Sequence, residues 1–221
     1  MKLLLATTNR GKIKELRRIL GDREIELVGL DTGETTEEIE TAATFAENAL
    51  LKARHYHQRT GLPTIADDSG LEVAALGGRP GVASARYAGP EASDAERIRK
   101  LLGELKDVPA ARRAARFVCA AALVWAGGEQ VFEDEARGAI LDEARGAGGF
   151  GYDPVFLYPP LGKTFAELSD AEKAEVSHRG RAFRRLATWL GAARVLDTPK
   201  AGDKMKLPTG ESSASSRRGD V

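Results

Sequence analysis

The chain is organised around one short stretch, Thr64-Ile65-Ala66-Asp67-Asp68-Ser69-Gly70. A short apolar run leads here directly into two carboxylates, a hydroxyl and a glycine, which is typical of a strand that ends at a loop where oxygen ligands meet. Adjacent residues of a strand point to opposite sides, so we expect one aspartate to face a cleft and the other to support the backbone. An acidic turn on a solvated loop has the same pattern, so the rest of the chain must supply a phosphate site and a second metal ligand.

Composition restricts the class of protein. At 221 residues the chain fits one large domain or two small lobes, and it is long enough to bury a core. Cys119 is the only cysteine, which excludes a disulfide framework. It lies in the apolar run 117–125, so we interpret it as a buried structural thiol rather than a nucleophile. A single thiol suits a reducing cytoplasm.

The charges balance, with 33 Lys plus Arg against 33 Asp plus Glu. No overall field attracts this protein to nucleic acid or to an anionic membrane, so we expect neither as a partner. Residues 1–6 are too short for the apolar part of a signal peptide, and the longest apolar run, 117–126, is too short to span a bilayer. The sequence therefore predicts a soluble, cytoplasmic protein.

A first candidate phosphate site follows residues 3–6, which form a predicted buried strand. Apolar residues then recur at helical spacing from Ile13 to Leu20. Free backbone N–H groups and the helix dipole favour an anion at such a helix start. The segment between strand and helix consists of Thr7, Thr8, Asn9, Arg10, Gly11 and Lys12. It is not a Walker A loop, which needs two glycines framing four residues before Lys-Ser/Thr. Phosphate binding and simple helix capping by Asn9 are equally supported.

A candidate metal ligand comes next. Residues 31–43 are rich in Thr and Glu, which is usual for a solvated loop, but Glu40 stands just before a predicted helix and is placed to reach a metal. Thr44 and Glu47 predict a capping box, and Gly61 ends the helix. Lys52 is predicted to lie off the apolar stripe of this helix, so it is either a surface lysine, the default, or a second phosphate contact.

Residues 71–135 are predicted mainly to support the fold rather than to form a site. Residues 71–76 suggest a further short element, and Ser93 with Glu96 predicts a second capping box before a helix. Residues 115–135 predict a hairpin. Arg86 is available either to a phosphate or to a surface carboxylate.

A glycine-rich segment, residues 146–156, is a candidate base site. Phe150 and Tyr152 offer rings to stack a planar base, Gly151 lets the backbone approach a ligand, and Asp153 is an acceptor for a base edge or a ribose. A glycine-rich surface turn between core aromatics is the alternative interpretation.

A second candidate base site follows in the chain. Lys173, on a short helix capped by Ser169 and Glu172, precedes His178 and Arg179 at the start of the last helix. This cluster suits an anion or a purine edge, and it is equally typical of a surface.

The last segment, residues 198–221, is rich in Pro, Gly, Ser and Lys without periodicity. We interpret it as a disordered tail after a single domain of residues 1–197.

Five of these segments together resemble the inosine triphosphate pyrophosphatase family, also called dITP/XTP pyrophosphatases. They are residues 7–12, 40–49, 66–70, 149–154 and 177–179, and the resemblance extends from Lys2 to about Leu190. Two positions depart from the family pattern: Thr8 stands where glycine is usual, and Ala174 where a polar residue is common. Neither removes a group with a proposed catalytic role.

The resemblance implies an α/β fold, with an elongated mixed β-sheet and flanking helices forming two lobes around a central cleft, and a homodimer. It implies Mg²⁺-dependent hydrolysis of ITP, dITP or XTP to the monophosphate and pyrophosphate. By the same resemblance, Glu40 and Asp68 match the metal ligands and Asp68 the general base. Lys52, Ser69 and Lys173 match triphosphate or substrate contacts, with Asn9 and Lys12 the main polar contacts of the phosphate loop. Residues 150–153 with His178 and Arg179 match the base pocket.

Two other functions remain open from the sequence. A Maf-like pyrophosphatase acts on other modified nucleotides, but the segments 150–153 and 177–179 argue against it. A nucleotide-binding regulator without turnover is less compatible with three retained carboxylates, Glu40, Asp67 and Asp68.

Overall fold

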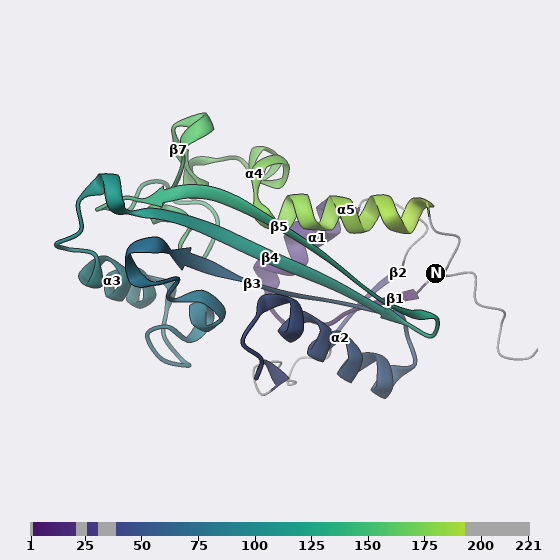
Figure 1. Ribbon diagram of the computed structural model, residues 1–221. Helices are drawn as coiled ribbons and strands as arrows, with labels where there is room; N and C mark the ends of the chain where they lie inside the picture. The colour runs from purple at the N-terminus through teal and green to yellow at the C-terminus, as the bar shows by residue number, and fades with distance from the viewer. Residues whose placement is uncertain (1, 21–25, 31–38, 193–221) are drawn as a thin grey trace, which may run out of the picture.

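The computed structural model describes residues 2–20, 26–30 and 39–192 (Figure 1). Its centre is a seven-stranded sheet in the order β2-β1-β3-β4-β5-β6-β7. The strands are β1 (Lys2–Leu5), β2 (Glu26–Gly29), β3 (Thr64–Val73), β4 (Ala114–Trp125), β5 (Gly128–Ile140), β6 (Phe156–Tyr158) and β7 (Lys163–Thr164). β1 pairs in parallel with β2 and β3, and the other neighbours are antiparallel. The expected mixed α/β sheet is confirmed, and its division into two lobes around a cleft stays a prediction.

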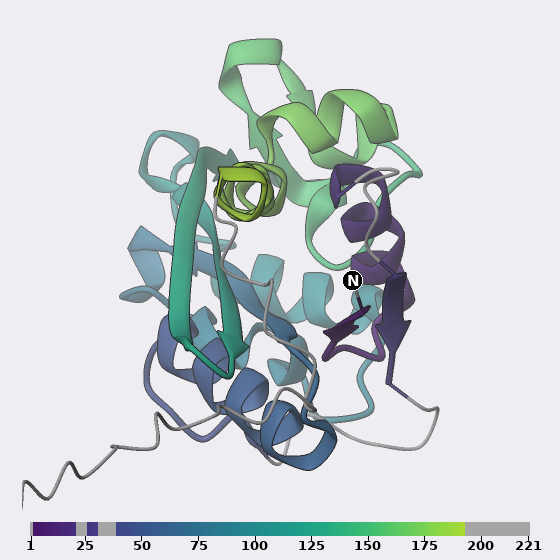
Figure 2. The same cartoon turned by 90° about the vertical axis from the view of Figure 1, so that its right-hand side faces the viewer.

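Helices cover both faces of this sheet. They are α1 (Arg10–Leu20), α2 (Phe45–Thr60), α3 (Asp94–Glu104), α4 (Asp170–Val176) and α5 (His178–Ala192). α1 and α5 lie on one face and α2 on the other (Figures 1 and 2). Two apolar clusters fit this arrangement: Ile65 belongs to the cluster that contains α5, and Ala66 to the cluster that contains α2. The alternation along β3 therefore sends neighbouring side chains into different layers.

β3 differs from the sequence-based expectation. We expected a strand that ends at Asp67 and a separate element at 71–76, but β3 runs on to Val73 and only a 3-10 turn, Ala74–Leu76, follows. The reason is the partner strand, because β4 pairs with β3 without interruption from Thr64 to Val73. Gly70 is not a turn residue: a Cβ there would lie 2.5 Å from the carbonyl oxygen of Gly81, so the glycine permits a close approach.

Local signals for the helix ends are largely confirmed. Ser93 and Ser169 each form a complete capping box, and Gly61 ends α2 in the left-handed conformation at φ 68°. Thr44 accepts the backbone N–H of Glu47, which gives half of the expected box. The predicted hairpin is present as β4 and β5, which extend beyond 115–135 to 114–140.

Some predictions lie outside the described residues. They include the disordered tail 198–221, the domain boundary at 197 and most of the acidic segment before Glu40. Within the residues that are described, no helix combines the length and the apolar character needed to cross a membrane.

Candidate active site

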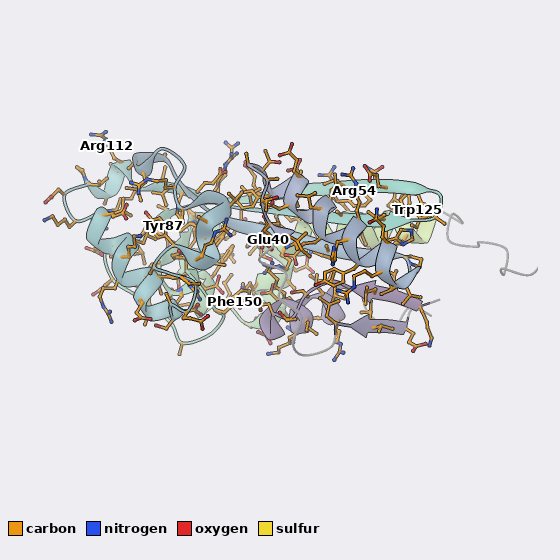
Figure 3. All side chains as sticks on the ribbon, turned by 90° about the horizontal axis from the view of Figure 1, so that it is seen from below. Glu40, Arg54, Tyr87, Arg112, Trp125 and Phe150 are labelled. Atoms are coloured by element: carbon orange, nitrogen blue, oxygen red, sulfur yellow. The ribbon has the colours of Figure 1, made fainter. Side chains whose placement is uncertain are left out.

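A cavity of ≈ 530 Å³ lies where the middle of β3 meets the loop before α1, the start of α5 and the glycine-rich segment. Glu40 and Phe150 both lie near the middle of the molecule, far from Trp125 at the tip of the β4–β5 hairpin (Figure 3). Every predicted site residue except Arg10 lines the cavity: Thr7, Thr8, Asn9, Gly11, Lys12, Glu40, Lys52, Asp68, Ser69, Phe150, Gly151, Tyr152, Asp153, Lys173, His178 and Arg179. Arg10 is the first residue of α1, and its side chain is outside the described part.

The start of α1 has the geometry of an anion site. Asn9 accepts the backbone N–H of Lys12 through Oδ1 at 3.1 Å, so it caps the helix, and it also lines the cavity. The two roles that the sequence left open are therefore compatible. The ammonium of Lys12 lies 3.0 Å from Asp67 Oδ2 and its side chain is 15% exposed, which leaves it a side open to the cavity.

The two adjacent aspartates have different surroundings. Asp67 points toward α1 and α5, where its Oδ2 lies 3.0 Å from Lys12 Nζ and 3.4 Å from Arg179 Nε. Its Oδ1 is buried and has no hydrogen-bond partner among the described residues. Burial alone would raise the pKa of this carboxyl, but Lys12 and Arg179 hold the pKa far below its usual range. Asp67 is therefore a fixed anion beneath the cavity rather than a proton acceptor.

Asp68 points to the other face, toward α2. Its Oδ2 accepts from Asn48 Nδ2 at 3.0 Å, and its Oδ1 accepts the backbone N–H of Ser69 at 2.9 Å. Burial raises the pKa of Asp68 and the nearby Glu40 raises it further, while Lys52 opposes them only in part. A carboxylate of raised pKa at a cavity wall is suited to accept a proton.

Lys52 is buried, with a relative exposure of 2%, so its default interpretation as a surface lysine is wrong. The reason is that its long side chain reaches from α2 to β3, where Nζ donates to Glu40 Oε1 at 2.5 Å and to the Asp67 carbonyl at 2.6 Å. Burial alone would lower the pKa of Lys52, but the charges of Glu40 and Asp68 raise it overall. Of the two alternatives for Arg86, a carboxylate partner is observed, since its Nη1 lies 4.0 Å from Glu40 Oε2.

We name residues 149–153 the base loop, after the role that the sequence predicts for them. Its aspartate, Asp153, is 3% exposed and accepts the backbone N–H of Phe150 at 2.8 Å and the ammonium of Lys173 at 2.6 Å. Asp153 therefore shapes the loop, whereas the sequence suggested an acceptor for a base or ribose. The ring of Phe150 lies 4.7 Å from Lys173 Nζ. Tyr152 is 4% exposed and donates its hydroxyl to the Ser84 carbonyl at 3.0 Å, so its ring belongs mainly to the core.

The histidine and arginine at the start of α5 are buried, so the surface interpretation of this pair is wrong. The ring of His178 stacks on Phe117 with centroids 4.7 Å apart and an interplanar angle of 8°. Burial lowers the pKa of His178 well below 6.5, and the neighbouring Arg179 and Lys173 lower it further, which keeps the imidazole neutral. Arg179 donates to Glu15 Oε2 at 2.6 Å and to Ser69 Oγ at 2.7 Å.

Sequence reasoning missed several polar residues of the site. Glu15 lies 2.8 Å from Lys173 and 2.6 Å from Arg179, and these cations lower its pKa although burial acts to raise it. Asn48 is fully buried and lies four residues before Lys52, a spacing that indicates one polar row on the inner face of α2. Asp94 and Arg97 also line the cavity. No sequence pattern indicated this, because the capping box of Ser93 and Glu96 already accounts for the polar residues at this helix start.

A divalent cation is compatible with the donors present. Glu40 is close enough to Asp68 to raise the pKa of that carboxyl, and both side chains line the cavity. Among the described residues no group of three or more His, Cys, Asp or Glu side chains forms a complete cage. Mg²⁺ commonly takes only one or two carboxylates and completes its shell with water and substrate phosphates, so the pair fits this ion.

Comparison with known proteins gives consistent matches. A family model described as the Ham1 family matches residues 3–189. The chain is 53% identical over 200 residues to a dITP/XTP pyrophosphatase of Frankia alni, covering 86% of this chain and 97% of the relative. It is 56% identical over 193 residues to a dITP/XTP pyrophosphatase of Mycolicibacterium paratuberculosis, covering 85% of this chain and 95% of the relative.

A solved structure is also similar. The nucleoside-triphosphatase / dITP/XTP pyrophosphatase from Mycobacterium abscessus superimposes with a TM-score of 0.69 at 48% identity, covering 84% of this chain and 98% of that one. All residues that line the cavity lie within the range matched by the family model.

Proposed function

This chain belongs to the Ham1 family, as its motifs predicted, and on that premise we propose that it hydrolyses non-standard purine nucleoside triphosphates, ITP, dITP and XTP, to the monophosphate and pyrophosphate. The names of its relatives support this activity. The observation that carries the proposal is the composition of the cavity, whose lining combines carboxylates and lysines, such as Asp68 and Lys52, with the aromatic ring of Phe150. A nucleotide needs both kinds of surface at once.

The phosphate end neutralises a crowded polyanion. Lys12 and Lys52 line it from opposite layers of the sheet, and Asn9 and Gly11 line the same cavity at the start of α1, where a helix favours an anion. Both lysines are held by carboxylates on the protein side, Lys12 by Asp67 and Lys52 by Glu40. Such fixed cations stabilise charge that develops on the phosphates without rearranging during the reaction.

Asp68 is the general base. Water attacks phosphorus at the α–β linkage, a new P–O bond forms, the bridging P–O bond breaks, and pyrophosphate leaves. Asp68 takes the proton of the water, for which its place on the cavity wall suits it. Ser69 contacts the substrate beside it, with its hydroxyl oriented by Arg179. Mg²⁺, held by Glu40 and Asp68, supplies charge neutralisation on the phosphates when it is bound.

Base selectivity comes from the aromatic ring of the base loop and from the start of α5. Phe150 stacks the purine, and the first turn of α5 at His178 and Arg179 presents donors to a 6-oxo oxygen. The backbone N–H of Phe150 and that of Gly151 are both engaged by carboxylates, so they are not the donors. Adenine carries a donor at this position, which leaves the donors of the site unpaired and disfavours ATP.

The decisive experiment is a substrate panel with Mg²⁺. ITP, dITP, XTP, other modified nucleoside triphosphates and the common triphosphates are incubated with the enzyme, and pyrophosphate is scored against orthophosphate. We expect pyrophosphate from the three non-standard purines and little turnover of ATP or GTP. Orthophosphate as the direct product would indicate a γ-phosphatase, turnover of other modified nucleotides alone would favour a Maf-like enzyme, and binding without turnover would favour a regulator.

We further propose that the enzyme acts as a homodimer in the cytoplasm. The family resemblance supports the dimer, and a lone buried thiol, Cys119, suits a reducing compartment. Light scattering on the purified full chain tests the first point, and a mass equal to one chain would contradict it. Fractionation of cells that express the protein tests the second.

A further inference from the structure

The base loop is held from two sides by carboxylates. From inside, Asp153 accepts the backbone N–H of Phe150 at 2.8 Å. From outside, Asp94 accepts the backbone N–H of Gly151 through Oδ2 at 2.7 Å, although the two residues are 57 positions apart. Gly149 and Gly151 both adopt positive φ, 71° and 61°, so the loop has little conformational preference of its own. These two anchors therefore help to set its shape, together with the hydrogen bond from the Tyr152 hydroxyl to the Ser84 carbonyl.

Asp94 is available for this contact because the start of α3 does not need it. Ser93 accepts the backbone N–H of Glu96, and Glu96 accepts that of Ser93, so the capping box is complete without Asp94. A carboxylate in the first turn of a helix is also favoured by the helix dipole. The Oδ2 atom of Asp94 is thus free of the cap and accepts from the base loop.

Arg97 fixes the orientation of Asp94. Its Nη2 donates to Asp94 Oδ1, while its Nη1 donates to the carbonyl oxygens of Ala85 at 2.7 Å and Ala92 at 2.8 Å. The guanidinium therefore connects α3 to the 3-10 helix Gly81–Arg86, which also accepts the hydroxyl of Tyr152 through the Ser84 carbonyl. Both Asp94 and Arg97 line the cavity.

We propose that Asp94 is a positioning residue for purine recognition. By accepting the N–H of Gly151, Asp94 sets the plane of the Phe150 ring, and Arg97 holds the Asp94 carboxylate in the orientation that this contact needs. The proposal rests on the proposed function. A ring stacks a base only if its face is presented at a fixed tilt. Lys173 and Arg179 lie near the ring of Phe150, but its backbone belongs to a loop with a glycine on each side, so the tilt also depends on what holds that loop. The phosphate end of the cavity makes no use of this contact.

The test compares base-containing and base-free ligands. Asp94→Ala removes the acceptor, and we expect the KM for ITP and the Kd for IMP to rise by roughly tenfold, the low end for a hydrogen bond to a charged group at a partly exposed site. Inhibition by tripolyphosphate, which has no base, stays unchanged. Asp94→Asn recovers most of the IMP affinity, because its amide oxygen accepts the same N–H.

Glu96→Ala is the matched control. It damages the cap of the same helix turn and lowers the melting temperature, but it touches no residue of the base loop, so IMP and tripolyphosphate affinities both stay unchanged. Equal loss of both ligands in Asp94→Ala, unchanged IMP affinity in that variant, or no recovery in Asp94→Asn overturns the inference. Wild-type protein that neither binds IMP nor hydrolyses ITP overturns the proposed function together with it. ITP turnover by the wild type, with Asp94→Ala unaltered, overturns this inference alone.

Discussion

Exchanging each of the two adjacent aspartates for asparagine should have opposite consequences. Asp68→Asn keeps the shape of the side chain and removes a charge that the folded protein disfavours, since burial and Glu40 raise the pKa of Asp68. Each unit of such a shift corresponds to about 1.4 kcal/mol. The substitution also weakens the hydrogen bond from Asn48 Nδ2 to residue 68, and this loss of about 1 kcal/mol opposes the gain from removing the charge. We therefore expect a free energy of unfolding within about 1 kcal/mol of the wild type, and a loss of turnover of about 10²- to 10⁴-fold.

Asp67→Asn provides the comparison. It leaves Lys12 and Arg179 without the anion that both contact through one oxygen, in a site where the carboxylate is only 1% exposed. Removing one partner of a buried ion pair costs about 3–5 kcal/mol, so this variant should be much less stable than Asp68→Asn. The folded-state pKa of Asp67 is lowered, so its contribution is present above the unfolded value of 3.8 and is lost as the pH falls. The stability gap to the wild type should close in acid.

The assay is urea unfolding at neutral pH in the presence of EDTA, which removes any contribution from a bound cation. Turnover of ITP is measured separately with Mg²⁺. Two results would refute the reasoning: Asp68→Asn destabilised as much as Asp67→Asn, or Asp68→Asn with near-normal turnover. The first would mean that the two carboxylates do not differ in charge environment, and the second that Asp68 is not the base.

Three further substitutions test separate features of the structure. The pKa of buried His178 lies below 6.5, so below that pH the unfolded chain binds a proton that the folded protein does not. The free energy of unfolding should therefore fall by up to about 1.4 kcal/mol per pH unit. In urea titrations at several pH values His178→Phe should show a shallower fall than the wild type, and equal slopes would contradict this. Lys52→Met should lower the free energy of unfolding in urea by about 3–5 kcal/mol, because it leaves the mostly buried carboxylate of Glu40 without its cation. Lys106→Met, at an exposed lysine, is the control, and equal losses of stability in the two variants would count against a contribution from the buried pair. Gly70→Ala should lower the free energy of unfolding by about 1–3 kcal/mol in thermal melts, because its Cβ meets backbone at 2.5 Å. Gly103→Ala, in open space on α3, should be neutral or stabilising in the same melts.

Local features were the most predictable part of the fold. The caps at Ser93 and Ser169 and the end of α2 at Gly61 depend on groups within four residues of one another, so short sequence patterns contain the necessary information. The boundaries of β3 were not predictable in this way. A charged pair followed by glycine normally ends a strand, and it does not do so here because β4 supplies ten consecutive partners.

The role of individual charges also needed the tertiary structure. Lys52 has the local sequence of a surface lysine, and only the packing of α2 on β3 shows that it is buried. Glu15 and Arg179 are 164 positions apart, and Asp94 and Gly151 are 57 apart, so no local pattern connects them. Burial then turns these contacts into strong effects on ionisation, because desolvation penalises each charge that is not paired.

The sequence by itself determined which chemical groups the site contains. The order of its motifs, from Thr7 to Arg179, predicted a family, a phosphate end and a base end, and it predicted that Asp67 and Asp68 would differ. The tertiary structure alone decided how they differ, because pairing of β3 with β4 fixes the strand while α1 and α5 bring cations to one face and α2 brings Asn48 and Lys52 to the other. The pKa of Asp67 is thereby held low and the pKa of Asp68 is raised, which is the difference that the proposed roles of the two aspartates require.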